Sequence, residues 1–122
     1  MFLGAADVLL LPMSDNLMNR ARGPIKLGDY LAAGRAIVAN PVGDLVDLFK
    51  QDDVGLLADA TPDAYGAAIA DLLVDRERCA RMGQRARQVA EEKYAWRLLA
   101  PTLLDVYSRA LDENCRESGS TA

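Results

Sequence analysis

The chain contains no histidine, only two cysteines and no long apolar run. Cys79 and Cys115 are far apart, and with no histidine to join them they form no zinc-binding motif. The absence of histidine also excludes a Ser-His-Asp triad within these residues. No apolar run approaches the ~20 residues of a membrane helix, and Met1–Leu11 lacks the basic start and cleavage site of a signal peptide. We therefore expect a cytoplasmic protein without a metal site.

Positive charge is scarce in the first part of the sequence. Residues 1–75 contain 5 Lys or Arg against 11 Asp, whereas residues 76–122 contain 9 against 7 acidic residues. The net charge of -4 argues against a nucleic-acid surface. Within residues 1–75 the basic side chains are clustered, because four of the five fall in one 16-residue stretch: Arg20, Arg22, Lys26 and Arg35.

Short apolar blocks alternate with helical patterns along residues 1–60. The blocks predict strands that are buried on both faces, and the 3.6-residue spacing between them predicts helices. The predicted strands are 6–11, stopped by Pro12, then 36–40 and 54–58. The helices between them are 24–33 and 44–49, and 14–23 is a polar loop. Pro24 suits a helix start and Gly34 a helix end. Strands that alternate with helices require crossovers, so we expect a parallel α/β sheet.

After Ala60 the pattern is helical only. We expect three helices: one from Thr61 as N-cap with Pro62 in its first turn, one at about 76–94 and one at about 96–113. Residues 1–113 then form one domain, and the polar tail 114–122 is expected to be disordered. Three strands are few for a doubly wound sheet, so we expect that the chain starts in the middle of a fold.

A candidate anion site lies where the basic residues cluster. Arg20 and Arg22 precede a helix N-terminus that follows a parallel strand, where backbone N–H groups and the helix dipole favour an anion. Lys26 and Asp29 share a helix face, so one can offer an ammonium to phosphate while the other accepts hydroxyl hydrogen bonds. Alternatively, they are a solvated surface pair. Gly43 can let the backbone approach a phosphate, or can simply permit the turn after the second strand.

These residues, in this order, resemble the nucleotide-sugar-binding C-terminal domain of group-1 retaining glycosyltransferases, which have the GT-B architecture. The resemblance runs from about Leu3 to Leu111, and its motifs are residues 4–12, 24–39, 41–44, 55–57, 81–87 and 94–96. It implies a partial Rossmann-like parallel sheet of about three strands, followed by three helices. It also implies a nucleotide-diphosphate sugar as substrate and no cofactor.

The resemblance assigns donor binding to particular residues. Asp29 takes the place of the acidic residue, usually glutamate, that holds the ribose hydroxyls, and Lys26 lies near the diphosphate or sugar. With these two residues we expect Arg22 and Gly43 at the donor site, and we assign no catalytic residue. The chain departs from the family at two positions: Ala21 replaces a second acidic residue, and Asp44 replaces a glycine after Gly43.

The resemblance covers only the last third of a complete enzyme. We therefore expect a C-terminal fragment or subunit of a glycosyltransferase, which binds the donor but is inactive alone. We also expect it to form a homo-oligomer, or to pair with a missing N-terminal domain or another chain, through the exposed edge of the 6–11 strand. One alternative is a noncatalytic binding or assembly module derived from the same fold. A sugar-nucleotide epimerase of the same architecture is another, although the closing motifs fit it less well.

Overall fold

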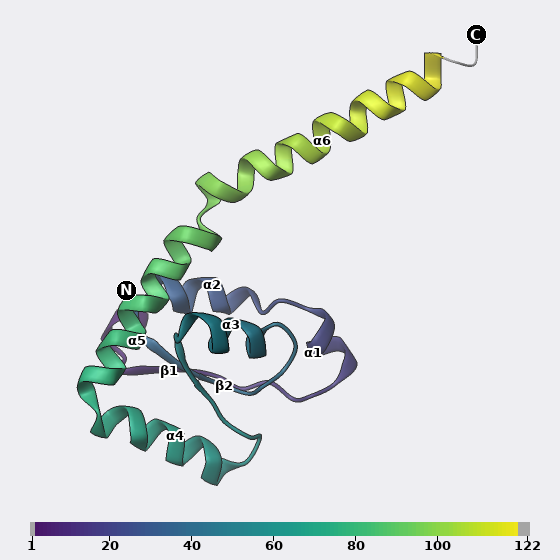
Figure 1. The fold of residues 1–122 in the computed structure, drawn as a ribbon. Coiled ribbons are helices and arrows are strands. Elements are labelled where there is room, and N and C mark those ends of the chain that lie inside the picture. Colours follow the sequence, from purple (N-terminus) through teal and green to yellow (C-terminus); the bar gives the residue numbers. More distant parts are fainter. Residues whose placement is uncertain (1, 120–122) are drawn as a thin grey trace. The chain divides into compact units, whose positions relative to one another are not determined.

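The computed structural model describes residues 2–119, with side chains described as far as Glu113. The chain divides into two compact units, the first ending at Glu91 and the second beginning at Glu92. The first unit holds the sheet and the helices that pack on it (Figure 1). The second unit is dominated by one long helix, α6, which spans Trp96–Gly119.

Three parallel strands form the sheet, as the sequence predicts. β1 (Val8–Leu11), β2 (Ala36–Ala39) and β3 (Gly55–Leu57) lie in the order β1-β2-β3. β2 is buried along its whole length, as expected of a central strand covered on both faces. The expectation that the first strand is also buried on both faces is wrong, because Leu10 is 42% exposed. Among the described residues β1 is an edge strand, so one of its faces is only partly covered.

Helices cover both faces of the sheet. α2 (Ile25–Ala32) and α3 (Leu45–Asp52) lie on one face, and α4 (Pro62–Val74) lies on the other (Figure 1). Because side chains alternate along a strand, Ile37 and Ala39 join the core on the α2 and α3 side, while Val38 packs on the α4 side. α5 (Arg76–Val89) contributes to both cores, through Ala86 and Val89 on one side and Met82 on the other.

Two close backbone approaches depend on glycine, one between α5 and the turn before β2 and one between β3 and β2. Gly34 ends α2 with φ +67°, a conformation that favours glycine. A Cβ at Gly83 of α5 would lie 2.6 Å from the carbonyl oxygen of Gly34. Gly55 is equally constrained, because a Cβ there would collide with the backbone of Ile37 on the neighbouring strand. These glycines let α5 and β3 approach β2 more closely than any other residue would.

The helices follow the predictions with three differences. A short helix, α1 (Leu17–Ala21), occupies part of the expected 14–23 loop, because the Asn16 side chain caps it by accepting a hydrogen bond from Asn19 N at 2.9 Å. The third strand is preceded by a longer helix than expected, since α3 continues to Asp52. The chain also begins with a 3₁₀ turn, Phe2–Ala5, before β1. α4 starts as predicted, with Thr61 Oγ1 accepting from Ala64 N at 3.2 Å.

The long helices after α4 are also those that the sequence predicts. α5 passes into a π-helical turn, Ala90–Tyr94, and α6 follows with Pro101 inside the helix. α6 extends to Gly119, beyond the predicted end near Glu113, and residues 120–122 of the expected tail lie outside the described residues. No helix in the described part of the chain is both long enough and apolar enough to cross a membrane. The expected cytoplasmic location stays a prediction.

Candidate functional site at the carboxyl edge of the sheet

The loops that follow the three strands meet at the carboxyl edge of the sheet, and one buried amide joins them. Asn40, directly after β2, is only 3% exposed. Its Oδ1 accepts a hydrogen bond from Met13 N at 2.7 Å, in the loop after β1. Its Nδ2 donates to the carbonyl of Ala58 at 3.0 Å, in the loop after β3. The Asn40 side chain therefore holds all three loops at one place.

Tyr65 of α4 completes this polar junction. Its hydroxyl lies 3.1 Å from Asn40 Oδ1 and 3.2 Å from the carbonyl oxygen of Leu11. Burial raises the pKa of Tyr65 above its ordinary value. An open hollow of about 320 Å³ lies beside it, lined by Leu10, Met13, Asn40 and Thr61 among others. Helical spacing in the sequence does not indicate this role for Tyr65.

The loop after β1 is organised by its own polar contacts. Asn19 Nδ2 donates to the carbonyl of Ser14 at 2.8 Å. Arg20, one of the clustered basic residues, forms a bidentate ion pair with Asp15. Its Nε donates to Oδ1 at 2.5 Å and its Nη2 donates to Oδ2 at 2.7 Å. This contact lowers the pKa of Asp15, chiefly through the hydrogen bond. The positive charge of Arg20 is therefore already paired, whereas no ion pair in the described residues involves Arg22, which is exposed.

Gly43 brings the loops after β1 and β2 into contact. It has φ +55°, and a Cβ at this position would lie 2.8 Å from the carbonyl oxygen of Arg20. Both the backbone conformation and the close approach therefore require glycine. The structure thus places Gly43 against Arg20 of α1. Arg20 is two residues before Arg22 in the chain. Asp44 follows as the N-cap residue of α3, without a side-chain hydrogen bond to the helix.

Lys26 and Asp29 lie on the solvent-facing side of α2. Leu27 and Leu31 bury the opposite side of the helix, which leaves Lys26 and Asp29 exposed. Neither has a hydrogen bond or ion pair with another side chain in the described part of the chain. Pro24 precedes the helix and provides no side-chain cap. The N–H of Leu27 donates to the carbonyl of Pro24, which leaves the N–H groups of Ile25 and Lys26 available to a ligand.

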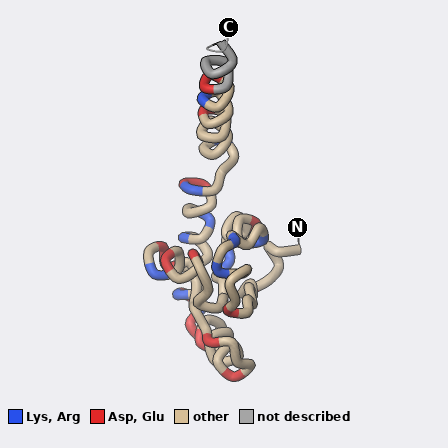
Figure 2. The backbone as a smooth tube through the Cα atoms, turned by 90° about the vertical axis from the view of Figure 1, so that its right-hand side faces the viewer, with Lys and Arg blue, Asp and Glu red and all other residues tan. Residues whose placement is uncertain are grey.

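The arrangement favours an anion more than a metal ion. Among the described side chains no group of three His, Cys, Asp or Glu is close enough to hold a metal. Because α2 follows β1, its N-terminus lies at the carboxyl edge, where its dipole and Lys26 both attract negative charge. Residues of both charge signs are interspersed along the backbone of the described residues (Figure 2).

The model of the family "Glycosyl transferases group 1" matches residues 1–89. The chain is 32% identical over 125 residues to a D-inositol 3-phosphate glycosyltransferase of Kineococcus radiotolerans, covering 95% of this chain and 27% of that protein. It is also 32% identical over 75 residues to a GDP-mannose-dependent alpha-(1-6)-phosphatidylinositol monomannoside mannosyltransferase of Mycobacterium tuberculosis, covering 61% of this chain and 20% of that protein.

A solved structure matches the fold. A sucrose-phosphate synthase from Thermosynechococcus elongatus superposes with a TM-score of 0.80 at 20% identity, over 92% of this chain and 27% of that one. This likeness supports the partial Rossmann-like sheet that the sequence predicts. The chain spans about a quarter of the length of the first curated relatives it matches.

Proposed function

Because the chain belongs to the group 1 glycosyl transferases, we propose that its carboxyl edge binds the nucleotide-diphosphate sugar donor of a glycosyltransferase. The observation that carries this proposal is the N-terminus of α2. It has no side-chain cap, and Lys26 and Asp29 project from it without partners among the described residues. Ligands of open α/β sheets bind outside the carboxyl ends of the strands, which is where this helix begins.

Each residue at this edge has a distinct role in the proposal. The free N–H groups of α2 and the Lys26 ammonium bind the diphosphate, since both supply positive charge at one helix end. Asp29, one turn further along, accepts hydrogen bonds from the ribose hydroxyls. Arg22 adds a second unpaired cation from the loop, and the close packing of Gly43 on α1 holds that loop in position.

The same groups stabilise the reaction's leaving group. Sugar transfer breaks the bond between the sugar and the diphosphate, so negative charge develops on the diphosphate oxygen as the bond opens. Fixed donors aimed at that oxygen lower the barrier without reorganising during the reaction. In this proposal the chain alone does not transfer sugar, because its relatives are about four times as long and the acceptor has to be held as well.

The edge of β1 is where a further polypeptide would pair. Among the described residues no strand pairs with the outer side of β1, and Leu10 there is 42% exposed. An exposed edge strand with an apolar side chain readily pairs with another chain. A second copy of this chain, or the remainder of a larger enzyme, is therefore the partner we propose. Sedimentation over a wide concentration range would contradict self-association if it found only monomers.

Calorimetric titration of the full chain with UDP, GDP and ADP tests donor binding. We expect saturable binding of at least one nucleotide, weakened by about tenfold or more in Lys26→Ala and Asp29→Ala, since each loses a charged contact. Lys50→Ala, at the far end of α3, and Asp112→Ala, on α6, are charge-matched controls that we expect to bind normally. A folded protein that binds none of the three at millimolar concentration would refute the proposal and favour the noncatalytic assembly module.

A further inference from the structure

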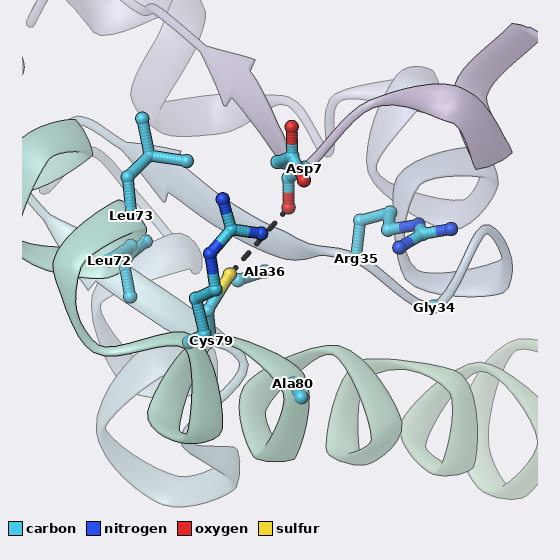
Figure 3. Close-up of a pocket in the computed structure, with 9 residues that line it drawn as sticks. Asp7, Gly34, Arg35, Ala36, Leu72, Leu73, Cys79 and Ala80 are labelled. Atoms are coloured by element: carbon cyan, nitrogen blue, oxygen red, sulfur yellow. Dashed lines mark hydrogen bonds between the residues drawn. The ribbon is translucent and has the colours of Figure 1, made fainter.

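A second hollow lies at the amino edge of the sheet, opposite the carboxyl edge described above. Asp7 directly precedes β1 and Arg35 directly precedes β2, so both lie at this edge. The first turns of α5 add Arg76 and Cys79, and the last turn of α4 adds an apolar wall (Figure 3). The hollow has a volume of about 190 Å³. None of the residues assigned to the donor site lines it.

Two arginines, Arg35 and Arg76, supply the positively charged hydrogen-bond donors among the residues that line the hollow. One terminal nitrogen of Arg35 donates to the carbonyl of Gly4. Its Nε is buried and has no hydrogen-bond partner among the described residues. A buried donor without an acceptor is costly, so an acceptor from a ligand would be favoured there. Arg76 lines the same hollow and forms no ion pair in the described part of the chain.

The charge balance of the hollow is positive. Arg35 and Arg76 contribute two positive charges, and Asp7 is the one acidic residue that lines it. The thiol of Cys79 donates a weak hydrogen bond to the carbonyl of Asp7, at 3.6 Å (Figure 3). The pKa of Cys79 is raised, chiefly by burial and also by the charges of Asp7 and Asp75, while the charges of Arg35 and Arg76 oppose the increase. Both guanidinium groups therefore act on the space around the sulfur.

We propose that this hollow binds a small oxyanion of the phosphate class, either free phosphate or the phosphate group of a small phosphorylated metabolite. Guanidinium groups recognise phosphate oxygens through paired N–H donors, and two arginines line one small cavity here. A volume of about 190 Å³ is below the ~300–1,000 Å³ typical of sites for larger ligands, so the hollow suits a small oxyanion better than a whole nucleotide. The site is therefore independent of the proposed donor site.

Cys79 offers a reporter within the hollow. In a Cys115→Ser background it is the one remaining cysteine, and its rate of alkylation by iodoacetamide reports access to the cavity. We expect phosphate to slow this alkylation saturably at constant ionic strength, and calorimetry to give the same affinity. An alkylation rate that phosphate does not change, together with no heat of binding at millimolar phosphate, would overturn the proposal.

Variants of the lining residues test the geometry. Arg76→Gln removes a cation that forms no ion pair with the described residues. We expect phosphate affinity to fall about tenfold or more, because a charge-assisted hydrogen bond is lost. Asp7→Asn should increase the affinity, because it removes the negative charge from the hollow. Arg81→Gln, on the exposed side of the same helix, is the matched control and should bind normally. Equal loss in Arg76→Gln and Arg81→Gln would contradict the assignment.

A second ligand distinguishes the two sources of phosphate. Glucose 6-phosphate is titrated beside inorganic phosphate under the same conditions. Tighter binding of the ester that remains sensitive to Arg76→Gln supports a phosphorylated metabolite as the ligand, and equal or weaker binding supports free phosphate. Because the donor site uses Lys26 and Asp29, the Lys26→Ala variant should retain the phosphate response. Failure of nucleotide binding and failure of phosphate binding are therefore separate results.

Discussion

Replacing Asn40 with alanine should destabilise the sheet unit strongly, because this one side chain joins the loops after all three strands. The substitution leaves the N–H of Met13 and the carbonyl of Ala58 without partners, and both residues are 7% exposed. Each buried unpaired group costs about 1–3 kcal/mol, so Asn40→Ala should lower the free energy of unfolding by about 2–6 kcal/mol. Such a loss is a large part of the ~5–15 kcal/mol that stabilises a typical domain.

The Tyr65→Phe variant provides the comparison. It removes the hydroxyl near Asn40, but Asn40 Oδ1 still accepts from Met13 N and its Nδ2 still donates to Ala58. The expected loss is therefore that of one ordinary hydrogen bond, about 0.5–1.5 kcal/mol. Urea unfolding of the full chain, followed by far-ultraviolet circular dichroism, measures both variants. If Asn40→Ala cost no more than Tyr65→Phe, the reasoning that Asn40 carries the junction would be refuted.

Three further predictions concern packing, pH and surface charge. Gly83→Ala should destabilise the protein by about 1–3 kcal/mol in the same urea assay, because the new Cβ would lie 2.6 Å from Gly34 O and backbone has to shift. Gly66→Ala on α4, where no atom lies within 4 Å, should instead be neutral or stabilising. Because the pKa of Tyr65 is raised in the folded protein, its protonated phenol contributes stability below the ordinary tyrosine pKa of about 10. That contribution is lost as the pH rises above this value. The wild type should therefore lose more stability than Tyr65→Phe between neutral and alkaline pH. Asp15→Ala removes only an exposed ion pair and should leave the urea midpoint unchanged.

The sequence was sufficient to predict most of the sheet and its helices. Short apolar runs predicted the strands, and cap residues such as Thr61 indicated where helices begin. α1 was missed because its five residues bury none of their side chains and so leave no apolar spacing. The exposure of Leu10 was missed because it depends on what lies beside β1, which its own sequence does not encode. These differences arise where tertiary context, rather than local pattern, decides the structure.

The polar sites illustrate the same limit. Asn40 stands out in the sequence as an amide after a buried strand, but its partners Met13 and Ala58 are 27 and 18 residues away. The hollow at the amino edge could not be predicted either, since Asp7, Arg35 and Arg76 belong to different elements and no motif joins them. By contrast, Lys26 and Asp29 lie three apart on one helix, so helical spacing alone places them on a shared face.

Nuclear magnetic resonance of the uniformly ¹⁵N-labelled full chain, titrated with UDP, GDP and ADP, tests the central claim most directly. If the carboxyl edge binds the donor, the backbone amides of residues 25–29 and of Gly43 will shift saturably with at least one nucleotide, and those of Asp7 and Arg35 will not. Saturable shifts confined to the amino edge, or no shifts with any of the three nucleotides, would contradict donor binding at α2.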